Sequence, residues 1–132
     1  MAAIDLQLIW QGKLQFSGSV GTQQFCLDGE KQAGVSPVEA LAAGLAGCMA
    51  IDVVHILERM RSPADSIQVR LQAERAGADP KRLVSARIHF EIAGDVLEKN
   101  VERAIDLSRE KYCSVWHSLR RDIALVVDYS IR

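Results

Sequence analysis

The chain has 132 residues, of which 48% are hydrophobic and 25% charged, a mixture typical of a single globular domain spanning residues 1–132. Sixteen basic and seventeen acidic residues leave a formal net charge of −1, which argues against nucleic acid or an anionic membrane as a partner. The apolar stretch 38–57 is interrupted by Glu39, Asp52 and His55, and the first eight residues lack a signal-like pattern. We therefore expect a cytoplasmic protein.

The first part of the chain predicts a small antiparallel meander. Residues 4–10 alternate apolar and polar side chains, residues 14–20 continue an apolar pattern, and Gly12 separates the two runs as a hairpin would. A short third strand at residues 25–27 ends at the turn-prone pair Asp28-Gly29.

A long helix is predicted to follow. Ser36 can cap its first amides, Pro37 suits the first helical position, and Glu39 completes a capping box. Apolar residues recur at helical spacing up to residue 57, and Pro63 prevents continuation. Because residues 42–47 are mostly Ala and Gly, another helix can approach this segment closely.

The remaining elements complete an α+β arrangement. Alternating apolar residues predict strands at 67–73 and 84–92 with a turn at 77–80 between them. An amphipathic helix is expected at 95–111, a short helix at 114–121 and a final strand at 123–131.

The chemistry depends on three cysteines, Cys26, Cys48 and Cys113, whose odd number and wide spacing do not suit a secreted disulfide framework. Cys48 lies within the predicted long helix, where a buried, inert thiol is the commoner role. Cys113 precedes a predicted short helix and lies near Lys111 and His117, a setting that favours the thiolate. The two thiols could meet in the fold and cycle between dithiol and disulfide, but the sequence does not measure their distance.

Two segments resemble the cysteine motifs of the OsmC/Ohr family, the osmotically inducible and organic-hydroperoxide-resistance proteins. Residues 36–53 (SPVEALAAGLAGCMAIDV) look like the first motif and residues 111–119 (KYCSVWHSL) like the second. The resemblance covers essentially the whole chain and is closest to the YhfA-like branch. It implies an interlocked homodimer in which antiparallel sheets wrap long central helices, with two active sites at the subunit interface.

The resemblance also implies a function. Cys48 would be the peroxidatic cysteine, Cys113 the resolving one, organic hydroperoxides the substrates and an external dithiol the reductant, with no metal or organic cofactor. The alternative is a non-catalytic or redox-sensing dimer that binds a small apolar ligand in the interface groove.

The chain departs from the hydroperoxidases of the family, which place an arginine on the early strands and a glutamate directly after the motif proline. Here Val38 follows Pro37, the glutamate is Glu39, and residues 1–57 contain no arginine. Lys13 is the cation of the early strands, so Lys13 and Glu39 are the candidate supporting residues. A lysine lacks the two-pronged donor of arginine, so a peroxidase of this sequence is expected to be slower than relatives that carry the arginine.

Asp52, His55 and His117 can each be interpreted in two ways. Asp52 and His55 lie one and two helical turns after Cys48, where they can share its face or serve as caps or interface residues. His117 can tune the Cys113 thiol or cap the short helix. A zinc site is disfavoured because no C-x-x-C or H-x-x-x-H pair supplies local ligand spacing, and Cys26 is expected to pack in the core.

Overall fold

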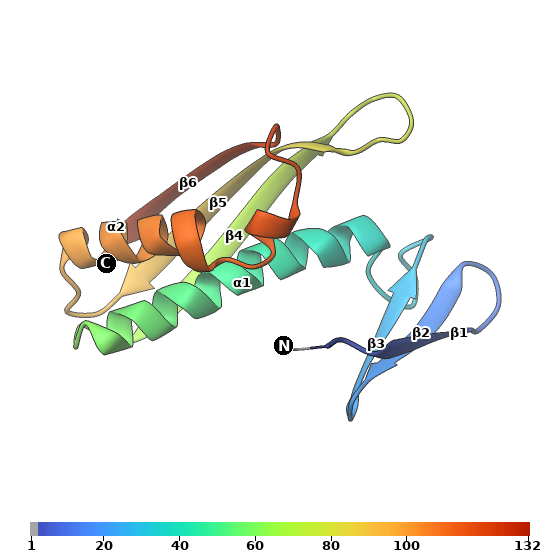
Figure 1. The fold of residues 1–132 in the computed structure, drawn as a ribbon, viewed down its shortest axis with the longest axis horizontal. Helices are drawn as coiled ribbons and strands as arrows, with labels where there is room; N and C mark the ends of the chain where they lie inside the picture. The colour runs from blue at the N-terminus through green and yellow to red at the C-terminus, as the bar shows by residue number, and fades with distance from the viewer. Residues whose placement is uncertain (1–2) are drawn as a thin grey trace. The chain divides into compact units, whose positions relative to one another are not determined.

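The computed structural model describes residues 3–132, which form two compact units, one up to Leu41 and the other from Ala42 onward. Figure 1 labels the elements of both units. The long helix α1 (Pro37–Arg59) begins in the first unit and continues into the second. Each unit is described by itself below.

The first unit contains the predicted meander. Strands β1 (Leu6–Trp10), β2 (Gln15–Val20) and β3 (Gln23–Asp28) form an antiparallel sheet in that order. Directly opposite residues share a face of such a sheet, so one face collects apolar residues of all three strands. These residues are Leu6, Leu8, Trp10, Phe16, Val20, Phe25 and Leu27.

This apolar face is open to solvent, with the Trp10 side chain 64% exposed and its large neighbours on β1 and β2 also exposed. Gly18 lies in the middle of the face, opposite Phe25. A Cβ on Gly18 would collide with the ring of Phe25, so the glycine lets that ring lie across the strand. We call the seven apolar residues of this face, together with Gly18, the meander face.

A carboxylate organises the loop between β3 and α1. Asp28 is buried and its side chain accepts N–H donors from Glu30, Gln32 and Ala33 at 2.8, 3.0 and 2.8 Å. These backbone hydrogen bonds, that of Ala33 foremost, hold the pKa of Asp28 below its ordinary value. The loop therefore has a fixed path into α1.

The predicted capping box at the start of α1 is confirmed. The Glu39 N–H donates to Ser36 Oγ at 3.2 Å, and the Ser36 N–H donates to Glu39 Oε1 at 2.9 Å. At the other end, Arg61 adopts a positive φ of 57° two residues before Pro63.

Helix α1 supplies a buried stripe at helical spacing, made by Leu45, Met49, Val53, Ile56 and Leu57. By length and composition alone this helix could also cross a membrane. The core helix of a soluble protein passes the same test, and α1 is the helix on which the core of the second unit is built.

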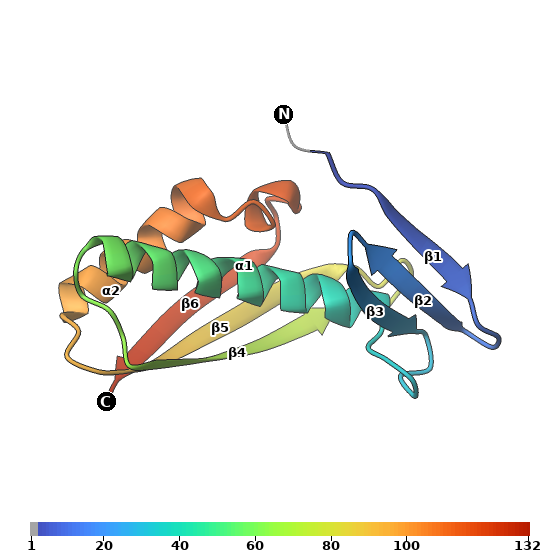
Figure 2. The same cartoon turned by 90° about the horizontal axis from the view of Figure 1, so that it is seen from below.

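The second unit is a sheet with helices on one face. Strands β4 (Ser66–Arg75) and β5 (Leu83–Ala93) form the predicted hairpin. Helix α2 (Glu98–Leu107), a π-helical turn η1 (Ser108–Tyr112) and a 3₁₀ turn η2 (Trp116–Ser118) follow, and β6 (Ala124–Ile131) ends the chain. Figure 2 shows α1 and α2 on the same side of this sheet, and the core lies between them and β5.

Strand β6 pairs with β5 in parallel, which differs from the antiparallel sheet that the sequence led us to expect. The reason is the connection between these strands. The chain leaves β5, returns across the sheet through α2 and the two turns, and so enters β6 in the direction of β5.

The prediction of a short helix at residues 114–121 is wrong. Within this range only Trp116–Ser118 is helical, and these three residues form a 3₁₀ turn. The helix predicted at 95–111 is also shorter in its α-helical part, which ends at Leu107 before the π turn begins. Cys113 has extended backbone angles, φ −71° and ψ 98°, and so separates η1 from η2.

Candidate redox site

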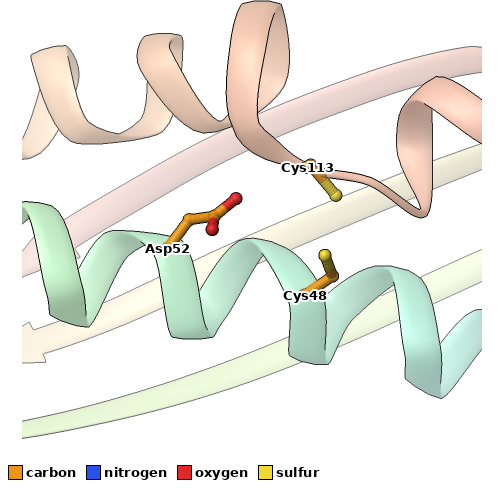
Figure 3. Close-up of side chains that lie close together, drawn as sticks. All are labelled: Cys48, Asp52 and Cys113. Atoms are coloured by element: carbon orange, nitrogen blue, oxygen red, sulfur yellow. The ribbon is translucent and has the colours of Figure 1, made fainter. Parts of the chain in front are cut away.

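Two cysteines and an aspartate meet in the second unit. Cys48 and Asp52 lie one turn apart on α1, and Cys113 directly follows η1. Figure 3 shows their side chains converging, and the two Sγ atoms and a carboxylate oxygen lie within 4.8 Å of one another. All three cysteines are free thiols. The fold thus brings together two thiols that are 65 positions apart in the sequence.

The π turn determines where Cys113 lies. The Cys113 N–H donates to the Ser108 carbonyl at 2.8 Å, five residues back, whereas an α-helical turn would use the carbonyl of Arg109. The Arg109 carbonyl instead accepts a hydrogen bond from His117 Nε2 at 2.9 Å. His117 thus bonds to a carbonyl of η1, a contact that differs from capping of the short helix at 114–121, and its influence on the Cys113 thiol stays a prediction.

The Cys113 thiol is fully buried, and burial is the main cause that raises its pKa to about 11. The Trp116 N–H, which donates to Cys113 Sγ at 3.4 Å, acts in the opposite direction. Cys48 and the Asp52 carboxylate raise the pKa further. The expectation that Cys113 favours the thiolate is therefore wrong, because desolvation outweighs the nearby donor.

Asp52 is held by a residue that the sequence analysis missed. Ser108 Oγ donates to Asp52 Oδ2 at 2.8 Å, and Ser108 is fully buried. Ser108 lies three and four positions after Ile105 and Ala104, which are buried residues of α2. A serine that continues the buried face of a helix needs a hydrogen-bond partner, and this signal was present in the sequence.

A cavity of about 440 Å³ opens beside Asp52. Its walls are mainly apolar, but His55 and Arg59 of α1 add two basic side chains. The structure thus places His55 near Asp52, as the helical spacing suggested. The remaining lining residues are Ile56, Met60, Leu107 and Tyr112.

The other candidate residues belong to the first unit and have local contacts there. Lys13 lies in the β1–β2 turn with a positive φ of 47°, and its carbonyl accepts the Trp10 indole N–H at 2.9 Å. Glu39 accepts the Ser36 N–H in the capping box, and this hydrogen bond is the main cause that lowers the pKa of Glu39. The Oε2 atom of Glu39 also lies 3.4 Å from Lys31 Nζ. Cys26 is half-buried on β3.

Comparison with known proteins identifies the family. The sequence model of OsmC-like proteins matches residues 28–128, a range that includes both cysteine motifs. The chain belongs to the OsmC-like family. Protein YhfA of Escherichia coli K12 is 35% identical over 125 residues, which cover 92% of this chain and 93% of YhfA. The sequence resemblance and its YhfA-like character are thereby confirmed.

Several solved structures have the same fold as this chain. A hypothetical protein from Aquifex aeolicus VF5 superposes with a TM-score of 0.93 at 26% identity, covering 100% of this chain and 98% of its own. An organic hydroperoxide resistance protein OsmC from Legionella pneumophila gives a TM-score of 0.73 at 14% identity, with 98% of both chains covered. The latter likeness concerns the fold alone.

Proposed function

We propose that this OsmC-like protein is a thiol-dependent peroxidase that reduces organic hydroperoxides through a Cys48/Cys113 dithiol–disulfide cycle in oxidative stress defence. The proximity of the Cys48 and Cys113 sulfurs carries this proposal. Cys48 is the more accessible of the two thiols, whereas Cys113 is fully buried. This difference supports Cys48 as the thiol that meets the peroxide and Cys113 as the thiol that resolves the product.

The cycle has three balanced steps. The Cys48 thiolate attacks the terminal oxygen of the hydroperoxide, the O–O bond breaks, and the products are a Cys48 sulfenic acid and, after protonation, an alcohol. The Cys113 sulfur then attacks the Cys48 sulfur, forms the disulfide and releases water. An external dithiol reduces this disulfide and is itself oxidised to a disulfide.

The surroundings of Cys113 suit the resolving role. Because its pKa is raised to about 11, the thiol keeps its proton at neutral pH and does not compete with Cys48 for peroxide. Its proton must leave when the disulfide forms, and the Asp52 carboxylate lies within 4.8 Å of both sulfurs. In this proposal Asp52 receives that proton and passes it to the departing hydroxide.

The cavity beside Asp52 would hold the organic group of the substrate, since most of its walls are apolar. Lys13 and Glu39 remain the candidate cation and carboxylate that support the Cys48 thiolate. If Lys13 has this role, Lys13→Ala lowers the rate of peroxide reduction, whereas Lys81→Ala, in the β4–β5 turn, leaves it unchanged.

We further propose that the working form is a soluble cytoplasmic homodimer. The meander face belongs to a unit of about forty residues and is open to solvent, and so small a sheet is not stable with one bare apolar face. Helix α1 also exposes apolar side chains, with Ile51 71% exposed. A second copy would cover both surfaces, and the family match across residues 28–128 supports one OsmC-like domain made of both units.

A second function, binding of a small apolar ligand without turnover, is favoured by two observations. The cavity is mainly apolar, and residues 1–57 lack the arginine of the hydroperoxidases. In that case the cysteine pair would act as a sensor or remain reduced.

The two functions are separated by turnover of cumene hydroperoxide with dithiothreitol as reductant. A peroxidase consumes many equivalents, Cys48→Ser abolishes consumption, and Cys26→Ser has no effect. Cys113→Ser still reacts once with peroxide but accumulates over-oxidised Cys48. Consumption that equals the rate of buffer and dithiol alone would reject the peroxidase.

A further inference from the structure

The side chains of Cys48, Asp52 and Cys113 form a donor set of two sulfurs and one carboxylate. Their donor atoms lie within 4.8 Å of one another. Around a tetrahedral zinc ion two sulfurs are about 3.8 Å apart and a sulfur and an oxygen about 3.6 Å apart, as the metal–ligand bond lengths require. Side-chain movements of about one ångström or less would therefore bring the three residues to metal-binding geometry.

The sequence argument against zinc concerned pairs of ligands close together in the chain, such as C-x-x-C. It does not apply to this set, because Cys48 and Asp52 come from α1 and Cys113 from the segment after η1. Figure 3 shows that these three side chains point toward a common space.

Two hydrogen bonds around the three residues would support metal ligands. Ser108 Oγ donates to Asp52 Oδ2 at 2.8 Å and so orients the carboxylate. The Trp116 N–H donates to Cys113 Sγ at 3.4 Å, a contact that stabilises a sulfur carrying negative charge. Such outer partners fix the orientation of metal ligands and commonly change metal affinity when they are removed.

We propose that the reduced protein binds one Zn²⁺ ion per chain through Cys48 Sγ, Cys113 Sγ and the Asp52 carboxylate, with the fourth position open to water. Two thiolates select a thiophilic ion of this kind over Mg²⁺ or Ca²⁺. Both thiols must lose their protons, so binding releases two protons per ion and strengthens as the pH rises.

Metal binding and disulfide formation use the same two sulfurs and exclude each other. One equivalent of hydroperoxide and two protons convert the zinc dithiolate into the disulfide, an alcohol, water and free Zn²⁺. This consequence for the redox cycle rests on the proposed peroxidase function, whereas the metal site itself does not. Zinc would then protect the reduced pair and inhibit peroxide turnover until it is removed.

The test is a titration of the reduced protein with Co²⁺ in the absence of peroxide. We expect one equivalent to give the near-ultraviolet thiolate-to-cobalt charge-transfer band and the intense visible bands of tetrahedral cobalt, both removed by Zn²⁺. Cys48→Ser and Cys113→Ser each lose most of the charge-transfer intensity. Asp52→Asn and Ser108→Ala keep both thiols, and we expect about a tenfold or greater loss of affinity in each.

Cys26→Ser is the matched control and should bind Co²⁺ like wild type, and protein oxidised to the disulfide should bind none. The site is rejected if reduced wild type gives no charge-transfer band, or if Asp52→Asn and Ser108→Ala both bind as tightly as wild type. Cobalt binding by a protein without peroxidase turnover would reject the proposed function alone. Turnover without cobalt binding would reject the metal site alone.

Discussion

His117 Nε2 donates to the backbone carbonyl of Arg109 at 2.9 Å, and this carbonyl is the one that an α-helical turn would have paired with the Cys113 N–H. His117 thus gives the Arg109 carbonyl a hydrogen bond in place of the helical one that it lacks in the π turn. We therefore expect His117 to influence Cys113 through the backbone, by stabilising the turn that places the thiol near Cys48.

Replacement of His117 by alanine should slow the resolving step. Loss of this hydrogen bond removes about 1 kcal/mol from the π turn, which corresponds to disulfide formation slower by about fivefold. The first reaction of Cys48 with peroxide should keep its rate. Rapid-quench alkylation with mass spectrometry measures both steps, and His89→Ala, on the face of β5 opposite the core, is the control. Equal disulfide kinetics in His117→Ala and wild type would show that the π turn does not need the histidine.

Mild peroxide treatment should join Cys48 to Cys113 and leave Cys26 reduced. The first two sulfurs are close together, whereas Cys26 lies on β3 in the other unit. Peptide mapping of the non-reduced protein identifies the bridge. A disulfide that mainly involves Cys26 would contradict the role assignment, as would sulfinic acid at Cys48 beside a reduced Cys113.

The alkylation of Cys113 should depend on pH as expected for a thiol with a pKa of about 11. In a Cys26→Ser/Cys48→Ser background this pKa falls somewhat, since Cys48 raises it, and the added change Asp52→Asn should lower it again. The sign follows because a nearby carboxylate disfavours the thiolate. Iodoacetamide rates from pH 7 to pH 11 measure the shift. A profile that Asp52→Asn leaves in place, or moves to higher pH, would contradict the contact.

Asp28 should make the protein sensitive to acid. Its folded-state pKa is lowered, so its stabilising contribution is complete above the unfolded value of about 3.9 and is lost as the pH falls through the folded value. Asp28→Asn should therefore be less stable than wild type at pH 7, and the difference should shrink below pH 4. Urea unfolding at several pH values measures it, with exposed Asp5→Asn as the control. A difference that is constant with pH would contradict the role of the charge.

The meander face should carry the dimer contact that we propose. Leu8 lies on this face and its neighbour Gln7 on the opposite one, because successive residues of a strand alternate. Leu8→Lys should weaken the dimer by at least tenfold, and Gln7→Lys should have no effect. Sedimentation velocity at micromolar concentration decides. A stable folded wild-type monomer under these conditions would refute the interlocked dimer.

Local features of this fold were predictable from the sequence. The Ser36/Glu39 capping box and the alternation along β4 and β5 involve residues only a few positions apart. The interactions that form these features are therefore visible in a short stretch of sequence. The π turn was not predictable, because residues 95–111 have the periodicity of one continuous helix. The closeness of Cys48 and Cys113 depends on how α1 packs against the end of α2, a long-range relation that no local pattern contains.

The π turn also has a consequence for chain length. A π turn holds one residue more than the α-helical turn it replaces. If one residue between Ser108 and Cys113 were deleted, the cysteine N–H could still donate to the Ser108 carbonyl, now four residues back as in an α-helix. Homologues that lack this extra residue but keep both motif cysteines would therefore be expected to end this helix in an ordinary α-helical turn and still bring their two thiols together.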